Sequence, residues 1–360
     1  MPLRPPTPYA PTSLARMTAA HGLWPKGAAT GCGSMPGTDP GEALAVVAGE
    51  LPDLPHLPES PNRGPGAELT GRAAALLVDL PLEHRSSGWA AAGAAGLDLR
   101  RARAYLAHDL DLLEERFAGY AGPLKVQVCG PVTLAATVEL RSGEKALADP
   151  GAMRDLARSL AEGVALHIAE VRRRVPGAEL LLQWDEPGLP AVLEGRVPTA
   201  SGWGRLRALQ PAEAEALLGA AFAAASRAGA APGAHCCAPE APVALLARSG
   251  ARFVSLDVTL AQPVEPLGEA LEAGIALIAG LVPADGSAGR AEPSDPGRTV
   301  APMRALWSRI GLPPEALADV AVSPTCGLSG AAPDAARAVL EASRLAARRL
   351  AEDPEGSVGR

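Results

Sequence analysis

The residues with the clearest chemical potential lie in the stretch GAHCCAPEA, where His235 and Cys237 are two positions apart. In an extended strand, positions i and i+2 point to the same side, so this imidazole and thiol leave the strand end together, while Cys236 faces the opposite way. A second segment, VSPTCGLSG, carries Cys326 and is typical of another strand end. Imidazole and thiolate groups suit a zinc ion, which makes these three side chains candidate metal ligands. The alternative is that the cysteines are inert core groups, because free cysteine is among the most buried residue types.

Eight short apolar segments alternate with helix-like patterns, and this alternation predicts an α/β fold, a single (β/α)8 barrel of parallel strands. The segments are ATGCGS, PHLPE, KVQVCG, ELLLQWD, GAHCC, ARFVSLD, IALIAGLVP and DVAVSPT. We expect PLEHRSSGWAAAGAAG to be a loop-like insertion. Active sites of such barrels lie at the carboxyl ends of the strands. The candidate residues at these ends are Ser34, Cys129, Asp185, His235, Cys237, Asp257 and Cys326.

Composition and charge argue against several classes of partner. The chain has 360 residues, of which 48% are hydrophobic, so one large barrel can be filled. Its formal net charge is -7, and its 33 basic residues are scattered, which argues against nucleic acid or an anionic membrane as the main partner. No run approaches the roughly 18 apolar residues that a membrane span requires.

The two ends of the chain and the cysteine count predict a simple organisation. Five cysteines without framework-like spacing do not indicate a disulfide scaffold, so a reducing cytoplasm is the expected location. Residues 1–28 are rich in proline and lack the apolar region of a secretory signal, so we expect a flexible extension. We expect the barrel to span residues 29–352 and a disordered tail to occupy residues 353–360.

Five motifs in order resemble one family. They are TGCGSMPGT, CGPVT, LQWDEPGL, the His-x-Cys pair and SPTCGL. Together they make the chain, after its extension, similar to the C-terminal catalytic barrel of cobalamin-independent methionine synthase. That family belongs to a superfamily shared with uroporphyrinogen decarboxylase and corrinoid-dependent methyltransferases.

The resemblance implies a zinc site. Its ligands would be His235, Cys237, Asp257 and Cys326, which occupy the positions of the family's zinc ligands. The family usually has glutamate at the third position, so Asp257 is a departure. Its shorter side chain would hold the metal less well, or leave room for a water molecule.

The resemblance also implies a substrate and a reaction. Homocysteine would be bound by the turn at Gly33 and Ser34 and by Asp185, and zinc would activate its thiol for methylation to methionine. The conventional methyl donor is methyltetrahydrofolate. Further candidates, for a supporting role or for the donor site, are Glu186, Cys129 and Thr133. A helix-capping or supporting carboxylate is the alternative interpretation of Glu186.

Three departures from the family concern the methyl donor. The chain has one barrel only, whereas the long enzymes carry an additional N-terminal half. Thr137 lies at or near the position of a tryptophan that stacks on the pterin in folate-dependent members. The catalytic histidine that follows the seventh strand in the family is missing from LIAGLVPADGS, so the catalytic acid is unassigned. Trp89 and Trp203 are candidates for a new stacking wall, or ordinary packing residues.

These departures keep other functions open. One alternative retains the zinc-thiolate chemistry with a methylcorrinoid donor, free or on a corrinoid protein, or with another thiol acceptor. A different class is a barrel that binds zinc or a thiol without turnover. Decarboxylation of a porphyrinogen is the least favoured function, because an anionic substrate requires a basic pocket.

Overall fold

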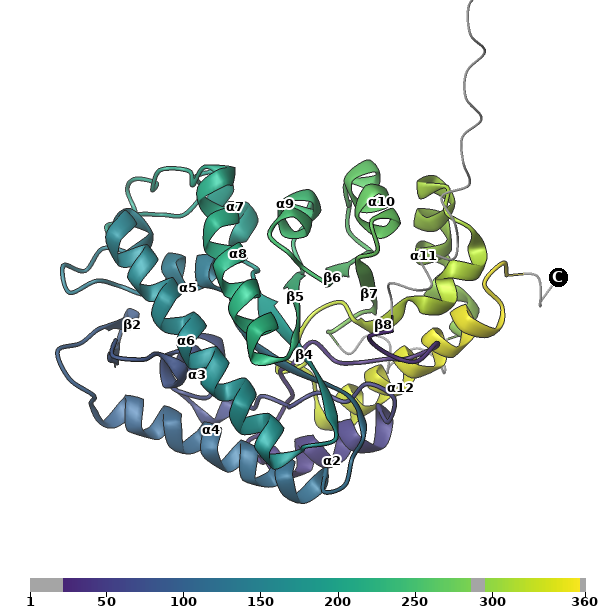
Figure 1. Cartoon of the computed structure of the whole chain (residues 1–360), viewed down its shortest axis with the longest axis horizontal. Coiled ribbons are helices and arrows are strands. Elements are labelled where there is room, and N and C mark those ends of the chain that lie inside the picture. The colour runs from purple at the N-terminus through teal and green to yellow at the C-terminus, as the bar shows by residue number, and fades with distance from the viewer. Residues whose placement is uncertain (1–21, 286–294, 357–360) are drawn as a thin grey trace, which may run out of the picture.

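A six-stranded parallel sheet forms the centre of the protein (Figure 1). The computed structural model describes residues 22–285 and 295–356. The strands pair with their neighbours in chain order, and the curled sheet has helices on its outer side. The strands are β3 (Gly122–Cys129), β4 (Ala178–Asp185), β5 (Ala231–Cys236), β6 (Phe253–Asp257), β7 (Ala276–Val282) and β8 (Ala321–Pro324). Each corresponds to one of the last six strand segments predicted from the sequence.

Two predicted strands do not form as regular strands. In the segments 29–34 and 55–59, only isolated bridges occur, between Ala29 and Val322, Ser34 and Glu59, and His56 and Lys125. Prolines and glycines explain the difference, because proline removes an amide donor and glycine weakens extended structure. The prediction of eight regular strands is therefore wrong at these two segments. The structure has a curled six-stranded sheet. The irregular segments 29–34 and 55–59 lie between its last strand, β8, and its first strand, β3.

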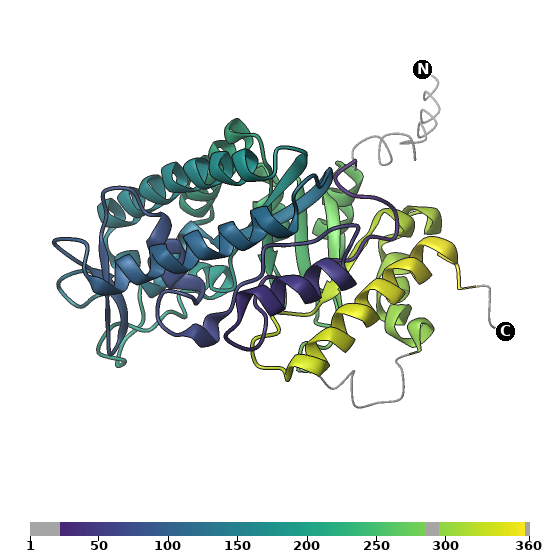
Figure 2. The same cartoon turned by 90° about the horizontal axis from the view of Figure 1, so that it is seen from below.

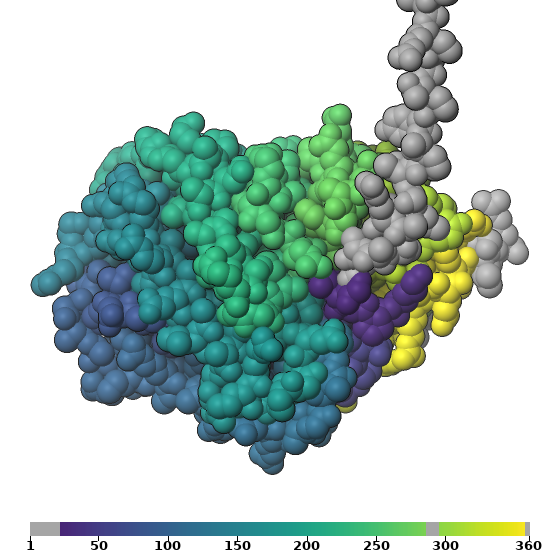
Figure 3. All heavy atoms as spheres, viewed as in Figure 1, coloured from purple at the N-terminus to yellow at the C-terminus, as the bar shows by residue number. Residues whose placement is uncertain are grey.

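Helices connect the strands and lie on the outer side of the sheet (Figure 1), and Figure 3 shows all heavy atoms in the same view. They are α2 (Pro40–Glu50), α3 (Leu69–Leu76), α4 (Leu97–Arg116), α5 (Pro131–Thr137), α6 (Pro150–Arg174), α7 (Leu189–Leu193), α8 (Pro211–Ala228), α9 (Val243–Arg248), α10 (Val264–Glu272), α11 (Pro296–Ile310) and α12 (Pro333–Glu352). Several begin at proline, which fits the first helical turn, where an amide hydrogen is not needed. The early helix α2 lies beside the last helix, α12, so the two ends of the fold meet (Figure 2).

The predicted loop-like insertion contains a β-hairpin instead. Strands β1 (Leu82–Arg85) and β2 (Gly88–Ala91) pair antiparallel across a tight turn. Trp89 in β2 is 3% exposed and donates its indole N–H to a carboxylate oxygen of Glu68. Burial of the tryptophan side chain and its hydrogen bond to Glu68 both stabilise the hairpin.

The chain packs from Leu23 onward, inside the range predicted as a flexible extension. The ring of Trp24 meets Phe253 edge-on with ring centroids 6.0 Å apart, and its indole N–H donates to the Asp319 carbonyl at 3.0 Å. Residues 1–21 of the predicted extension lie outside the described residues, as do residues 357–360 of the predicted tail. Asp353, at the start of that tail, is buried.

The inner side of the sheet changes from apolar to polar along the strands. At one end lies a cluster that we call the apolar floor, formed by Ala28, Leu54, Leu181, Phe253, Ala276, Ile278 and Ala321. Because every second residue of a strand points to the same side, the next inner positions are Gln183 after Leu181 and Ser255 after Phe253. Both are buried. The strands therefore form the apolar floor with their first residues and carry polar groups toward their carboxyl ends. Within the described residues, no helix is long and apolar enough to cross a membrane.

Candidate metal centre

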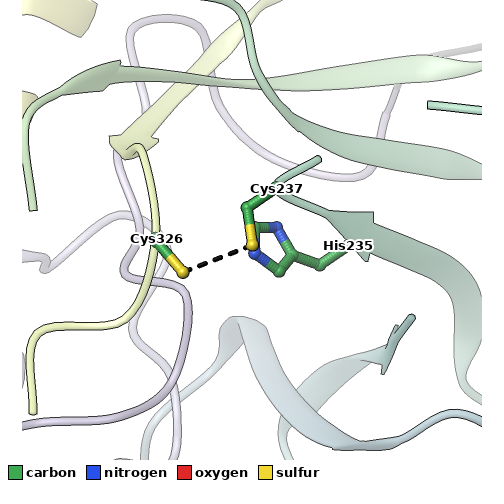
Figure 4. A group of neighbouring side chains, drawn as sticks. All are labelled: His235, Cys237 and Cys326. Carbon is green, nitrogen blue, oxygen red and sulfur yellow. Dashed lines mark hydrogen bonds between the residues drawn. The ribbon is translucent and has the colours of Figure 1, made fainter. Parts of the chain in front are cut away.

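His235, Cys237 and Cys326 meet at the carboxyl ends of two strands (Figure 4). His235 is near the end of β5, Cys237 follows that strand directly, and Cys326 follows β8. One ligand atom from each lies within 4.8 Å of the other two. The two sulfur atoms are 3.3 Å apart. Two thiols and an imidazole that converge in this way can hold a metal ion such as zinc.

The imidazole of His235 has one nitrogen engaged and one without a partner. Its Nδ1 lies 3.0 Å from the Ser255 hydroxyl, whereas its Nε2 is buried without a hydrogen-bond partner. A buried polar atom without a partner is costly, and a metal ion would remove that cost. The hydrogen bond that the two thiols share lowers the pKa of Cys326, with a further contribution from His235, and raises the pKa of Cys237. A thiolate on Cys326 is the form that binds metal.

Asp257 is not part of this group. It ends β6, and its Oδ1 accepts hydrogen bonds from the amide of Thr259 at 2.9 Å and from the Thr259 hydroxyl at 2.5 Å. An aspartate that caps its own following turn is a common local arrangement. The short side chain is thus used within its own loop, and the group that can hold a metal consists of one histidine and two cysteines.

A pocket of about 320 Å³ opens beside the three side chains. Gly33 and Ser34 form part of its wall, as predicted for the turn after the first segment. The turn is held by the Glu59 amide, which donates to the Gly33 carbonyl, and by the Leu328 amide, which donates to the Ser34 carbonyl. A side chain at Gly33 would collide with Gln127, whose Cγ would lie 2.8 Å from the added Cβ. Only glycine fits this close approach.

Three carboxylates line the same pocket, and among the described residues no lysine or arginine does. They are Glu59, Glu68 and Asp185. Burial raises the pKa of Asp185 to about 7, although His235 and Lys125 oppose that shift. Burial also raises the pKa of Glu59, against the effect of Arg72, whose Nε lies 3.3 Å from Glu59 Oε1. A pocket with this lining favours a cationic group on its ligand.

Glu186 and Thr133 form a buried hydrogen-bonded pair away from the pocket lining. The Glu186 carboxylate accepts hydrogen bonds from the amides of Val132 and Thr133, at 2.9 and 2.7 Å, and from the Thr133 hydroxyl at 2.6 Å. The carboxylate therefore caps the first turn of α5 and joins that helix to the end of β4. Cys129 is 1% exposed and also lies outside the pocket lining.

None of the three residues considered for a methyl-donor site, Thr137, Trp89 and Trp203, places an aromatic ring in the pocket. Thr137 ends α5, and its hydroxyl donates to backbone carbonyls of the same helix at 3.0 Å. Trp89 is buried against Glu68, and Trp203 is 96% exposed. Neither tryptophan lines the pocket.

A larger hollow of about 760 Å³ lies between α6 and α8, on the outer side of the helices. Alanines make up most of its lining. It holds no group of side chains suited to bind a metal, to judge from the described residues. We therefore place the chemistry in the smaller pocket, where the titratable groups converge.

Comparisons with known proteins find similar solved structures but no similar sequence. No protein-family model matches the chain, and no curated protein sequence matches it. Among solved structures, the chain is similar to a B12-independent methionine synthase from Shewanella sp. W3-18-1 in complex with selenomethionine. The identity is 16% and the TM-score is 0.47; the match covers 68% of this chain and 66% of that one.

The sequence analysis missed Glu59 and Ser255. Glu59 closes PHLPE, a proline-rich segment, and its carboxylate lines the pocket. The signal was its position at the end of a strand-like segment, the same place that Asp185 has in β4. Ser255 precedes Asp257 by two residues, so it lies on the same side of β6 and reaches His235.

Proposed function

We propose that the protein is a zinc-dependent thiol S-methyltransferase that converts homocysteine to methionine, with methyltetrahydrofolate as the conventional donor. The observation that carries the proposal is the convergence of His235, Cys237 and Cys326 beside a pocket lined by carboxylates. The order of the five sequence motifs supports the same function.

The three side chains fit a catalytic zinc ion. Catalytic zinc sites commonly use three protein ligands and keep the fourth position for water or substrate. His235 would bind through Nε2, which is buried without a partner, and the two cysteines would bind as thiolates. Zinc bound there would lower the pKa of the substrate thiol, so that its sulfur is a nucleophilic thiolate at neutral pH. Asp257 remains a proposed additional ligand that must leave its own turn to bind.

The remaining residues would bind and orient the amino acid. Asp185 and Glu59 would accept hydrogen bonds from the substrate ammonium, and charge-assisted bonds of this kind are stronger than neutral ones. Amides and carbonyls of the turn at Gly33 and Ser34 would contact the rest of the amino-acid backbone. Fixing both groups directs the sulfur toward the methyl donor, which reduces the entropy that the reaction must lose.

A methylcorrinoid is the second candidate donor. An amine such as the folate nitrogen leaves poorly unless a general acid protonates it, whereas cobalt leaves without a proton. Within residues 22–285 and 295–356, His235 is the only histidine in the pocket lining, and it is a proposed metal ligand. This lining and the absence of an aromatic side chain at Thr137 favour the corrinoid, free or on a partner protein.

A barrel that binds zinc or a thiol without turnover is the proposal of another class. It shares the metal site, so zinc content cannot separate it from the enzyme. Formation of methionine from homocysteine with methyltetrahydrofolate or methylcobalamin separates the two. Methionine from either donor supports the enzyme and identifies the donor, whereas thiol binding without methionine favours the binding protein.

Zinc content and thiol-dependent proton release test the proposed function. The wild type should hold about one zinc per chain and release a proton when homocysteine binds, because the thiol must lose its proton. Cys326→Ala should lose both properties. Cys236→Ala is the matched control, since Cys236 is buried in the core next to Cys237 and lies outside the metal-binding group. A wild type without zinc, or with zinc but without proton release, would contradict the proposal.

A further inference from the structure

Lys125 places an ammonium group in the interior of the protein. It lies in β3 and its side chain is fully buried. The Nζ atom donates to the Cys32 carbonyl at 3.2 Å and approaches Gln127 Oε1 at 3.5 Å. Both acceptors are neutral oxygens. Burial of a charge is costly. A buried lysine whose direct acceptors, within the described part of the chain, are both neutral therefore needs a further reason.

One hydrogen-bonded path runs from Lys125 to Glu59. The amide oxygen of Gln127 accepts from Lys125 Nζ, and the Nε2 of Gln127 donates to Glu59 Oε1 at 3.2 Å. The same amide nitrogen donates to the Leu57 carbonyl at 2.6 Å, which fixes the orientation of the glutamine. The path thus ends at one carboxylate of the pocket.

A second path runs from Lys125 to Asp185. The Cys32 carbonyl accepts from both Lys125 and Gln183 Nε2, the latter at 2.8 Å. Gln183 Nε2 also donates to Asp185 Oδ1 at 2.7 Å. Gln127 and Gln183 are paired residues of β3 and β4, so the two paths leave the lysine side by side. The second path also holds Cys32, which precedes the turn at Gly33 and Ser34.

The charges are consistent with this arrangement. Burial lowers the pKa of Lys125 to about 8, while Asp185, Cys32 and Glu59 act in the opposite direction. The ammonium is therefore largely protonated at pH 7. Its charge favours the ionised forms of Asp185 and Glu59. The buried lysine thus lies behind two carboxylates of the pocket, one of which, Glu59, also pairs with the buried Arg72. Among the described residues, no lysine or arginine lines that pocket.

We propose that Lys125 is a positioning residue that holds Glu59 and Asp185 in place, so that both carboxylates bind the ammonium of an amino-thiol substrate. The inference rests on the proposed function for the identity of that substrate. Lys125 does not line the pocket, so it acts through the two glutamines and the carbonyl of Cys32. A purely structural lysine would affect all ligands equally, whereas a positioning lysine affects ligands that carry an ammonium group.

The test compares two ligands of the zinc-loaded protein, homocysteine and 4-mercaptobutanoate, which lacks the amino group. Lys125→Met should weaken homocysteine binding about tenfold or more, which corresponds to one lost charge-assisted hydrogen bond. The affinity for 4-mercaptobutanoate and the zinc content should stay unchanged. Lys26→Met is the control, because Lys26 is exposed and pairs with Asp319 at the surface. Equal losses for both ligands, or none, would overturn the proposal.

Two further measurements keep the result decisive. Gln127→Met cuts the path to Glu59 and leaves the buried ammonium in place. It should therefore cause a smaller loss of affinity, and only for homocysteine. This variant can be tested even if Lys125→Met does not fold. Crystal structures of the wild type and the folded variant, without ligand, should show displaced carboxylates at Glu59 or Asp185. Unmoved carboxylates overturn the proposal. A wild type that binds no thiol would refute the proposed function, while the crystal structures would still decide the role of Lys125.

Discussion

The two ends of the sheet's inner side use the same strands for opposite purposes. At the apolar floor, Phe253 and Ile278 are fully buried and pack against other aliphatic and aromatic groups. Two residues further along β6, Ser255 contacts His235, whose Nε2 has no partner. The floor consists of buried apolar groups that pack together, whereas the other end retains unpaired polar atoms and carboxylates with raised pKa values. In β6, a residue that packs in the floor and a residue that contacts a proposed metal ligand are therefore only two positions apart.

This separation explains how costly polar groups are tolerated. Burial of carboxylates, thiols and an ammonium destabilises a fold unless neighbouring groups offset it. The floor and the outer helices provide large apolar contacts that do not depend on the site. Changes at one end should accordingly leave the other end intact.

The largest expected effect is on stability, at the floor. Ile278 lies in β7, which carries none of the proposed site residues. Ile278→Ala should reduce the free energy of unfolding by roughly 2–5 kcal/mol, because the cavity cannot fully collapse. Urea denaturation measures the loss, and zinc content should remain at the wild-type value. Loss of zinc from the folded variant would mean that the two ends are coupled.

A second prediction concerns a histidine in the helical layer. His167 in α6 is 5% exposed, and burial, assisted by Arg72, lowers its pKa to about 4. As the pH falls, the histidine is therefore protonated in the unfolded state before it is protonated in the folded state. Its contribution to the free energy of unfolding is fully present above the unfolded pKa of about 6.5 and decreases as the pH falls toward 4. Between pH 7 and pH 5 the contribution should fall by about 2 kcal/mol.

Denaturation of the wild type and His167→Gln at several pH values measures that contribution. The difference between the two curves isolates this histidine from other titrating groups. The stability advantage of the wild type should decrease over this range. A difference that stays constant with pH would show that His167 has the same pKa in the folded and unfolded states, which would contradict the prediction.

The third prediction concerns the polar end. Ser255→Ala removes the hydroxyl beside His235 Nδ1, so the imidazole loses the contact that orients it. Groups that orient metal ligands typically contribute 10–100-fold to metal affinity. Competition with a zinc chelator should show a loss of about this size. Ser343→Ala is the control, since Ser343 is buried in α12 and donates to the Val339 carbonyl. Equal zinc affinities for the two variants would exclude an orienting role.

Strand periodicity made most of the fold predictable. Six apolar runs became strands, and their last residues indicated which side chains would meet: His235 and Cys237 were assigned to one side from spacing alone, and the structure brings them to Cys326. The prediction could not extend to the segments 29–34 and 55–59, where proline and glycine permit bridges without a ladder. Glu59 was missed for that reason.

Side-chain orientation after a strand end was harder to predict. Asp257 follows the correct register, yet its carboxylate accepts hydrogen bonds from Thr259, two residues later. Lys125 and Gln127 stand in an apolar-looking run, and their roles depend on contacts with Cys32 and Glu59, which are distant in sequence. Such long-range partners leave no local pattern in the chain.

The most direct test of the central claim is X-ray absorption at the zinc edge of the purified protein. The account predicts two sulfur neighbours at about 2.3 Å and nitrogen or oxygen neighbours at about 2.0–2.2 Å. Addition of homocysteine should raise the number of sulfur neighbours from two to three. A spectrum with fewer than two sulfurs, or one that homocysteine leaves unchanged, would contradict the assignment of His235, Cys237 and Cys326 as a thiol-activating zinc site.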